Sequence, residues 1–283
     1  MFGSHLSIAG GPHHALMAAR RLKLDCLQIF TANQRQWSPP APTDELVEQW
    51  HAERRRTPIP VASHDSYLIN FASPRREVRE KSIRLFVDEL ARCEALGIGH
   101  VVAHPGAHLG IGAARGLDRV VGALDRIHKR RVDCPVVTCL EITAGQGTTL
   151  GVTLGELRAI LDAVAEPGRL AVCVDTAHAL AAGYDLTSAA GAEDFVAQLD
   201  GTFGLDLVKV VHVNDSQTPL NSRRDRHEHV GLGHVALDAF GVICRAFPQT
   251  PKILETPKGT DPRGREWDKL NLKALRRLAR ARS

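Results

Sequence analysis

The sequence lacks several features that would place a protein in a specialised class. No apolar run approaches the roughly 20 residues that span a membrane, and the first residues lack the basic and apolar stretches of a signal sequence. The six cysteines include no Cys-x-x-Cys pair, so we expect reduced, buried thiols. We find no internal repeat and no low-complexity segment. We therefore expect a globular protein of the cytoplasm with no membrane partner.

Short apolar runs alternate with amphipathic segments eight times along the 283 residues, and no long polar linker divides them. This alternation is typical of repeated βα units. It predicts an α/β fold, a single (β/α)8 TIM barrel in which residues 1–283 form one domain. We predict strands at 3–8, 26–30, 59–63, 100–103, 136–140, 170–174, 207–213 and 252–254, helices at 74–96, 112–131, 154–164, 236–247 and 267–281, and irregular insertions at 31–42, 143–151 and 214–233.

Residues of the types that bind metal ions recur where the predicted strands end. Asp175 follows the apolar run 170–174, and His178 lies three residues later. On its own, this pair would be an acid that caps the next helix and a histidine that packs beneath it. Barrel enzymes place their chemistry at the C-terminal ends of the strands, so recurrence at six consecutive strands favours a metal site at this rim. The strand-end residues are His64, His104, Glu141, Asp175 with His178, His212 and Glu255. Asp225 and His227 lie in the loop after strand seven, where an extended backbone would direct both side chains the same way.

The ligand set indicates both the metal and the chemistry. Imidazoles and carboxylates without thiolates fit zinc, with manganese or iron as alternatives. Five histidines and four carboxylates exceed the needs of one tetrahedral ion, so a two-metal site with a third ion is expected. Three divalent ions bring six positive charges, of which the four carboxylates cancel four. The surplus suits a phosphate and a hydroxide, and it favours phosphoester chemistry over sugar isomerisation.

Several motifs of the chain carry a resemblance to a known family. They are Gln34-Arg-Gln-Trp37, His64-Asp-Ser-Tyr-Leu-Ile-Asn70, His104-Pro-Gly-Ala-His108, Thr143-Ala-Gly-Gln-Gly147, Val174-Asp-Thr-Ala-His178, His212-Val-Asn-Asp215, Asp225-Arg-His227 and Leu254-Glu-Thr-Pro257. In this order, from residue 3 to about residue 278, the chain resembles endonuclease IV (deoxyribonuclease IV), the zinc-dependent apurinic/apyrimidinic endonucleases of base-excision repair. Two positions depart from the family pattern: Ile142 replaces a polar residue, and Ser63 replaces a common proline.

The resemblance implies three zinc ions and a reaction. It assigns His64, His104 and Glu141 to the first ion, Glu141, Asp175, His212 and Glu255 to the second, and His178, Asp225 and His227 to the third. It implies that a hydroxide between the first two ions attacks the phosphodiester 5′ to an abasic site in duplex DNA. The products would be a 3′-hydroxyl and a 5′-deoxyribose phosphate. Glu141 and Glu255 are the expected catalytic residues.

The same resemblance points to the residues that contact DNA. A nucleotide without a base is cheaper to extrude than an intact one, and side chains must then fill the gap in the duplex. The candidate wedge residues are Asn33, Gln34, Arg35, Tyr67 and Leu68, and the candidate phosphate-binding residues are Arg223, Arg224 and Arg226. We interpret the other basic clusters, including the C-terminal tail, as solvated surface.

Other histidines and other functions remain to be weighed. His229 can compete with His227 for the third ion, and His5 and His108 are candidate partners of ligands or phosphate. His13, His14, His51, His100, His128 and His234 are expected to be ordinary surface or helix residues. The alternative enzyme is a xylose-isomerase-like metal-dependent sugar isomerase or epimerase, against which the third ligand set argues. An inactive DNA-lesion binder is the other alternative. We expect a monomer in the cytoplasm, associated with the nucleoid.

Overall fold

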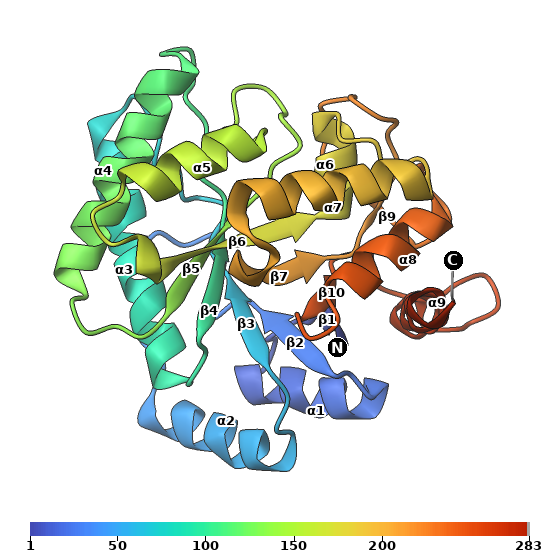
Figure 1. Cartoon of the computed structure of the whole chain (residues 1–283). Coiled ribbons are helices and arrows are strands. Elements are labelled where there is room, and N and C mark those ends of the chain that lie inside the picture. Colours follow the sequence, from blue (N-terminus) through green and yellow to red (C-terminus); the bar gives the residue numbers. More distant parts are fainter. Residues whose placement is uncertain (282–283) are drawn as a thin grey trace.

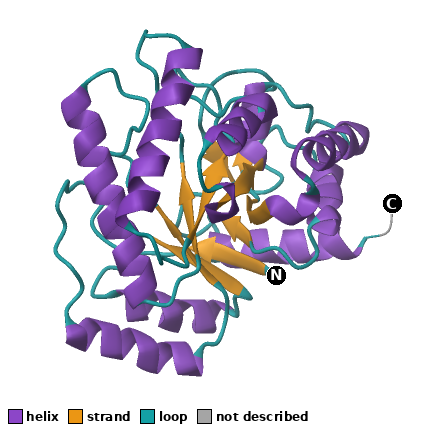
Figure 2. Cartoon of the chain, turned by 60° about the vertical axis from the view of Figure 1, so that its left-hand side comes forward, coloured by secondary structure: helices purple, strands orange, loops and turns teal. Residues whose placement is uncertain are grey.

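Eight parallel strands close into a barrel, and helices surround it (Figures 1 and 2). The computed structural model describes residues 1–281, so the last residues of the basic tail, Arg282 and Ser283, lie outside the described residues. The strands are β1 (Phe2–His5), β2 (Cys26–Ile29), β3 (Val61–His64), β4 (His100–Ala103), β5 (Val137–Glu141), β6 (Leu170–Asp175), β7 (Val208–His212) and β10 (Lys252–Leu254). Each pairs with its neighbour along the chain, and β10 closes the barrel on β1. The predicted (β/α)8 architecture is confirmed.

The helices follow the strands as predicted. They are α1 (Pro12–Leu22), α2 (Asp44–Arg56), α3 (Arg76–Ala95), α4 (Ala113–Arg130), α5 (Leu154–Ala163), α6 (Thr176–Ala182), α7 (Ala189–Phe203), α8 (Leu237–Ala246) and α9 (Trp267–Arg280). Two 3-10 turns, η1 (Pro167–Arg169) and η2 (Leu205–Leu207), lead into β6 and β7. Periodicity explains the choice of face: Val120, Leu124 and Ile127 of α4 are buried at helical spacing. None of the helices in the described part of the chain is long and apolar enough to cross a membrane.

Two strands differ from their predicted bounds by more than one residue at an end, for local reasons. The first ends at His5, short of residue 8, because a turn closes from Gly11 N–H to Ile8 O and Pro12 then begins α1. The third begins at Val61 because Pro60 has no N–H to donate. Within the insertion predicted at 214–233, the chain forms a two-stranded antiparallel hairpin of β8 (Asp215–Ser216) and β9 (His227–Glu228).

Small apolar side chains fill the barrel beneath the rim. Cys26, Ala62, Val102, Cys139, Ala171, Cys173, Val210 and Ile253 form this inner cluster. All six cysteines are buried and unbridged, and burial raises the pKa of Cys26 and Cys139 to about 12. The thiols are therefore inert core residues, as the spacing predicted. The strands above them end in polar residues, so the candidate functional groups lie at the C-terminal rim of the barrel.

Candidate metal centre

The structure gathers the predicted ligands at the C-terminal rim into three neighbouring clusters. The first cluster is His64, His104 and Glu141, and the second is Glu141, Asp175, His212 and Glu255. In each, one ligand atom from every residue lies within 4.8 Å of the others. Ligand atoms of Asp175, His178 and His227 also lie within 4.8 Å of one another. Asp225 Oδ1 lies near both imidazoles, and we call His178, Asp225 and His227, with Asp175 beside them, the third cluster.

In the first cluster, two imidazoles converge on one carboxylate oxygen. Glu141 Oε2 lies 3.3 Å from His64 Nε2 and 2.9 Å from His104 Nε2. The other ring nitrogen of His64 lies 3.0 Å from the carbonyl oxygen of Asp65, to which it donates. In the neutral ring Nε2 therefore carries a lone pair that faces the carboxylate.

The second cluster is the most deeply buried. His212 Nδ1 lies 3.0 Å from Glu141 Oε1, 3.2 Å from Glu255 Oε2 and 3.7 Å from Asp175 Oδ2. Gln28 fixes the ring, because its Oε1 accepts from His212 Nε2 at 2.9 Å while its Nε2 donates to Glu255 Oε1 at 2.7 Å. The lone pair of Nδ1 consequently points at three carboxylates.

The third cluster combines the start of α6 with the hairpin. His178 Nδ1 lies 3.0 Å from the carbonyl oxygen of Ile142, to which it donates, so its Nε2 lone pair faces Asp225 Oδ1 at 3.2 Å. His227 Nε2 lies 3.5 Å from the same oxygen and 3.6 Å from Asp175 Oδ2. Asp225 is the outermost member, with 44% of its side chain exposed. The two-residue spacing thus brings Asp225 and His227 together, and Asp175 also borders this cluster.

Asp175 performs both roles that the sequence allowed. Its Oδ1 accepts from the backbone N–H of His178 at 2.7 Å and so caps α6. Its Oδ2 faces the histidines of the second and third clusters and accepts from Asn214 Nδ2 at 2.6 Å. The helix cap and the cluster member are one carboxylate.

The donor set of all three clusters fits divalent cations. Lone pairs of His64, His178 and His212 point at carboxylate oxygens, and two acceptors that face each other inside a protein need a positive charge between them. Buried His178 Nε2 and His227 Nε2 have no hydrogen-bond partner in the described part of the chain. A ring that donates one nitrogen to a protein oxygen and presents the other is the usual arrangement of a metal-binding histidine.

The pKa shifts of the clustered residues also show that their surroundings favour bound positive charge. Burial opposes the imidazolium of His64, but the neighbouring carboxylates of Asp65 and Glu141 prevail and raise the pKa well above 6.5. The pKa of His178 is raised in the same way, with Asp175 and Asp225 prevailing over burial. For Glu141, burial favours the neutral acid, yet the surrounding imidazoles hold its pKa well below 4.5. Protons and metal ions therefore compete for these ligands.

Three positioning residues were given no role from the sequence, although Asn214 and Asp215 lie in the quoted motif His212-Val-Asn-Asp215. Gln28 links His212 to Glu255, and Asn214 donates to Asp175 while accepting from the backbone N–H of Glu255 at 2.7 Å. Asp215 accepts from the backbone N–H groups of Gly231, Gly233 and Val235 and so shapes the loop that carries β9. A signal existed for the first, because Gln28 is a buried amide inside an apolar strand and such a group needs partners.

The candidate wedge residues lie beside the first cluster. Ser66 Oγ donates to Gln34 O at 3.1 Å, which joins the loop of Asn33, Gln34 and Arg35 to the segment of Tyr67 and Leu68. Tyr67 is 70% exposed, and its ring packs edge-on against Phe30, 5.6 Å between centroids. An exposed aromatic ring next to buried His64 is typical of a surface that binds another molecule.

The basic loop 223–226 borders the third cluster. Arg223, Arg224 and Arg226 are exposed, and the Arg223 side chain lies against Gly145 of the loop after β5. Gln146 of that loop accepts from the backbone N–H of Asp225 at 3.1 Å. Two insertions thus meet at the rim, and arginines flank the outermost ligand along the chain.

Comparisons with known proteins place the chain in a family. Residues 16–280 match the family described as the xylose isomerase-like TIM barrel. A probable endonuclease 4 of Geobacter sulfurreducens is 45% identical over 99% of this chain and 95% of its own length. The crystal structure of endonuclease IV from Thermus thermophilus superposes with a TM-score of 0.84 at 34% identity and covers 98% of both chains. The chain belongs to the endonuclease IV family.

The endonuclease IV resemblance drawn from the motifs is thereby confirmed. A D-tagatose 3-epimerase-like protein also matches, with a TM-score of 0.76 over 98% of this chain and 96% of that one, but at 20% identity. A likeness at that identity shows a shared barrel and no more. The sugar isomerase alternative is not favoured.

Both departures from the endonuclease IV pattern have a structural account. Ile142 contributes to the third cluster through its carbonyl oxygen, so its buried apolar side chain leaves the ligand contact intact. Ser63 Oγ donates to the buried carboxylate of Glu89 at 2.5 Å. Glu89 also accepts from Thr31 and Arg92, at 2.6 and 2.7 Å, and ties the end of β3 to the start of the wedge loop.

The remaining histidines divide into partners and structural residues. His5 Nδ1 lies 3.3 Å from Glu255 Oε1, whereas His108 Nδ1 accepts from the backbone N–H groups of Gly110 and Gly112. His229 stacks on Trp267 at 3.8 Å and so points away from the third cluster. His128 lies on α4, as expected of a helix residue, and is buried, whereas His100 is the first residue of strand β4 and so departs from the expectation.

Proposed function

We propose that the protein is a metal-dependent endonuclease that incises duplex DNA 5′ to abasic sites in base-excision repair and leaves a 3′-hydroxyl. The lone pairs of His64, His178 and His212 that face carboxylates carry this proposal, because they describe a centre built for several cations. Membership of the endonuclease IV family supports it.

We propose zinc as the metal, with three ions per chain. The first cluster would hold one ion, the second cluster another with Glu141 shared between them, and the third cluster the last. When bound, such ions supply Lewis acidity that polarises phosphoryl oxygens and makes water a nucleophile at neutral pH. The protein's own part is to orient the ligands: Gln28, Asn214 and the carbonyl oxygens of Asp65 and Ile142 fix the rings and carboxylates.

The nucleotide must reach this buried centre, which assigns a role to the rim. We propose that Arg35 and Tyr67 occupy the gap in a duplex whose abasic nucleotide is extruded toward the clusters. Arg223, Arg224 and Arg226 would then hold backbone phosphates by charge-assisted hydrogen bonds. Asn33, Gln34 and Leu68 would complete the surface that fills the gap. We further propose a monomer that works in the cytoplasm at the nucleoid.

A nicking assay tests the proposal. Purified protein loaded with zinc should cut a duplex with a single abasic analogue and leave the matched intact duplex uncut, and a chelator should abolish cutting. Incision that persists after metal removal would contradict the metal assignment. Conversion of a ketose with no nicking would restore the isomerase alternative, and tight abasic-DNA binding without nicking would indicate a lesion binder.

The wedge assignment has its own test. Tyr67→Ala and Arg35→Ala should each lower the preference for abasic over intact duplex by about tenfold, the effect of losing one stacking contact. Affinity for intact duplex should change less, because salt-sensitive phosphate contacts supply most non-specific binding. Arg55→Ala on the exposed face of α2 is the control. Full discrimination in both variants would show that other residues fill the gap.

A further inference from the structure

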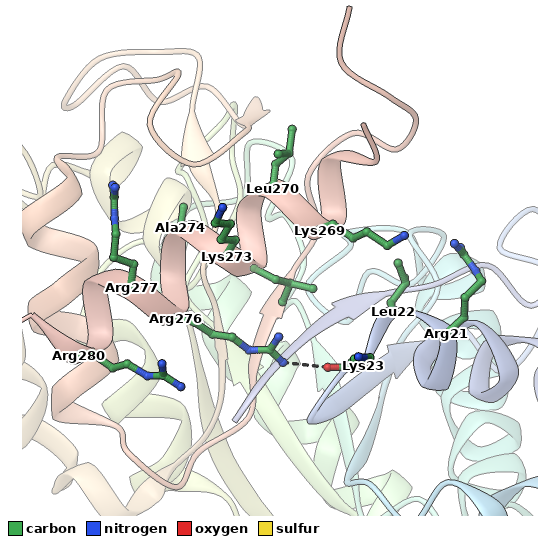
Figure 3. Close-up of a pocket in the computed structure, with 11 residues that line it drawn as sticks. Arg21, Leu22, Lys23, Lys269, Leu270, Lys273, Ala274, Arg276, Arg277 and Arg280 are labelled. Atoms are coloured by element: carbon green, nitrogen blue, oxygen red, sulfur yellow. Dashed lines mark hydrogen bonds between the residues drawn. The ribbon is translucent and has the colours of Figure 1, made fainter. Parts of the chain in front are cut away.

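A groove of about 890 Å³ lies between α1 and α9, on the outside of the barrel (Figure 3). Helix α9 contributes Lys269, Lys273, Arg276, Arg277 and Arg280 to its edge. Arg21 and Lys23, at the end of α1, face them from the other side. Among the described residues no carboxylate lines the groove, so its charge is of one sign.

The charge of this groove is only partly neutralised by neighbouring acids. Glu266 pairs with Arg21 and Lys269, and Asp25 pairs with Arg276. In the described part of the chain, Lys23, Lys273, Arg277 and Arg280 form no salt bridge. Arg277 and Arg280 stand in the last turn of α9, where cations complement the helix dipole. Lys23 caps the C-terminus of α1 and has the same explanation, whereas Lys273 in the middle of α9 has none.

The groove also exposes some apolar surface between its cations. Leu22 and Leu272 line it but are almost fully buried, so this surface comes from the half-buried Leu270 and Ala274. Apolar surface surrounded by cations matches a ligand that carries both negative charges and apolar groups. Phosphates of a duplex would be served by the cations alone.

The groove is separate from the metal centre, although one helix serves both. The opposite face of α9 carries Trp267, which stacks on His229, and Asn271, which accepts from Val230 N–H at 3.2 Å. These contacts support the loop of β9 from within. Lys273 and Arg277 are exposed on the outer side, so their replacement leaves the inner contacts in place.

We propose that this groove binds an acidic protein segment with apolar side chains, in which carboxylates pair with the cations of α9 and α1 while apolar groups cover Leu270 and Ala274. The partner is thus a protein that presents a short acidic, apolar motif in extended or helical form. Binding there is independent of the incision reaction.

Fluorescence anisotropy with a labelled peptide of alternating aspartate and leucine tests the proposal on the full-length protein. The peptide should bind saturably and more weakly as salt rises. The double variant Lys273→Glu, Arg277→Glu should weaken binding by about tenfold or more, since two charge reversals remove two favourable pairs. The matched control is Lys129→Glu, Arg130→Glu at the exposed end of α4, which carries the same charge change and should bind like the unaltered protein.

Two further measurements separate the apolar from the charged contribution to peptide binding and test DNA as the competing occupant. Leu270→Asn should weaken the aspartate–leucine peptide several-fold while leaving binding of an all-aspartate peptide of equal charge unchanged. Nicking of abasic DNA should be unaltered in the groove variants. Absence of saturable peptide binding, an equal loss in the α4 control, or a loss of DNA binding confined to the groove double variant would each overturn the proposal, the last by assigning the groove to nucleic acid.

Discussion

At the end of the barrel where the strands begin, Lys252 is buried and donates to two backbone carbonyl oxygens. Its ammonium group donates to the carbonyl oxygens of Phe247 and Thr250 and lies 5.4 Å from the centre of the Phe2 ring. At the opposite rim, the imidazoles of His178, His212 and their neighbours present lone pairs to carboxylates. At one end a buried cation meets carbonyl oxygens, and burial lowers its pKa; at the other end several imidazoles and carboxylates converge.

The two ends of the barrel differ in a way that separates structural from functional polar groups. Both ends contain ionisable side chains that are almost fully buried, so burial does not distinguish them. What distinguishes them is the kind of partner: the donors of Lys252 meet carbonyl oxygens, whereas the imidazoles of the rim converge on carboxylates. Groups that converge in this way bind a proton or a metal ion between them, which makes the rim a candidate cation site.

The largest effect on incision should come from the second cluster, which shares Glu141 with the first. Glu255→Gln keeps the shape of the side chain but removes one negative charge beside His212, 3.2 Å away. We expect turnover on abasic DNA to fall by about three orders of magnitude, with affinity for abasic duplex largely retained. Glu193→Gln, an exposed acid on α7, is the control. Near-normal turnover in the Glu255 variant would refute the assignment of the second cluster.

A smaller but more specific effect is expected at the third cluster. His227→Ala removes one of its members, and a three-ligand site rarely keeps zinc tightly after such a loss. Zinc content measured by plasma mass spectrometry should drop by about one ion, and incision should fall by about 100-fold. His234→Ala, an exposed histidine of the same loop, should retain full zinc content. If the two variants hold equal zinc, Asp225 and His227 are ordinary loop residues.

Replacement of a residue that positions ligands should be milder still. Gln28→Leu removes the acceptor of His212 Nε2 and a donor to Glu255. The loss should weaken metal binding by about 10–100-fold, so incision should recover when zinc is supplied in excess. Gln49→Leu on the exposed face of α2 should change neither quantity. A loss of incision that excess metal does not repair would give Gln28 another role.

The opposite end should behave differently. Lys252→Met leaves two carbonyl oxygens without a donor, which costs about 1–3 kcal/mol of unfolding free energy. Zinc content and incision should stay unchanged, because the candidate ligands lie at the other rim. Urea denaturation, zinc analysis and nicking check the three statements. Loss of zinc from this variant would mean that the two ends are not independent.

The sequence predicted the barrel because each buried strand and each long amphipathic helix carries its own periodic signal. The five helices named from the sequence agree with the structure within two residues at each end. The hairpin of β8 and β9 was not predicted, since strands of two residues have no periodicity to detect. The loop around it depends on Asp215, whose carboxylate accepts from backbone N–H groups up to 20 residues away along the chain.

The clustering of the candidate ligands was predictable for the same reason that the barrel was. Strand ends meet at one rim, so residues far apart in sequence, such as His64 and Glu255, are brought to one place by the topology alone. Their partners were harder to find, because Gln28 and Asn214 act through contacts between strands that sequence spacing does not reveal. The groove between α1 and α9 joins the two ends of the chain, and only its basic C-terminal residues stood out in the sequence, where we interpreted them as solvated surface.

The most direct test of the account is the stoichiometry of zinc against activity. Metal-stripped protein should be titrated with zinc while bound zinc and nicking of abasic duplex are measured together. We predict three zinc ions per chain and full incision only when all three are present. Full incision by the metal-free protein, or three bound ions with no incision of abasic DNA, would contradict the claim that these clusters form a DNA-cleaving centre.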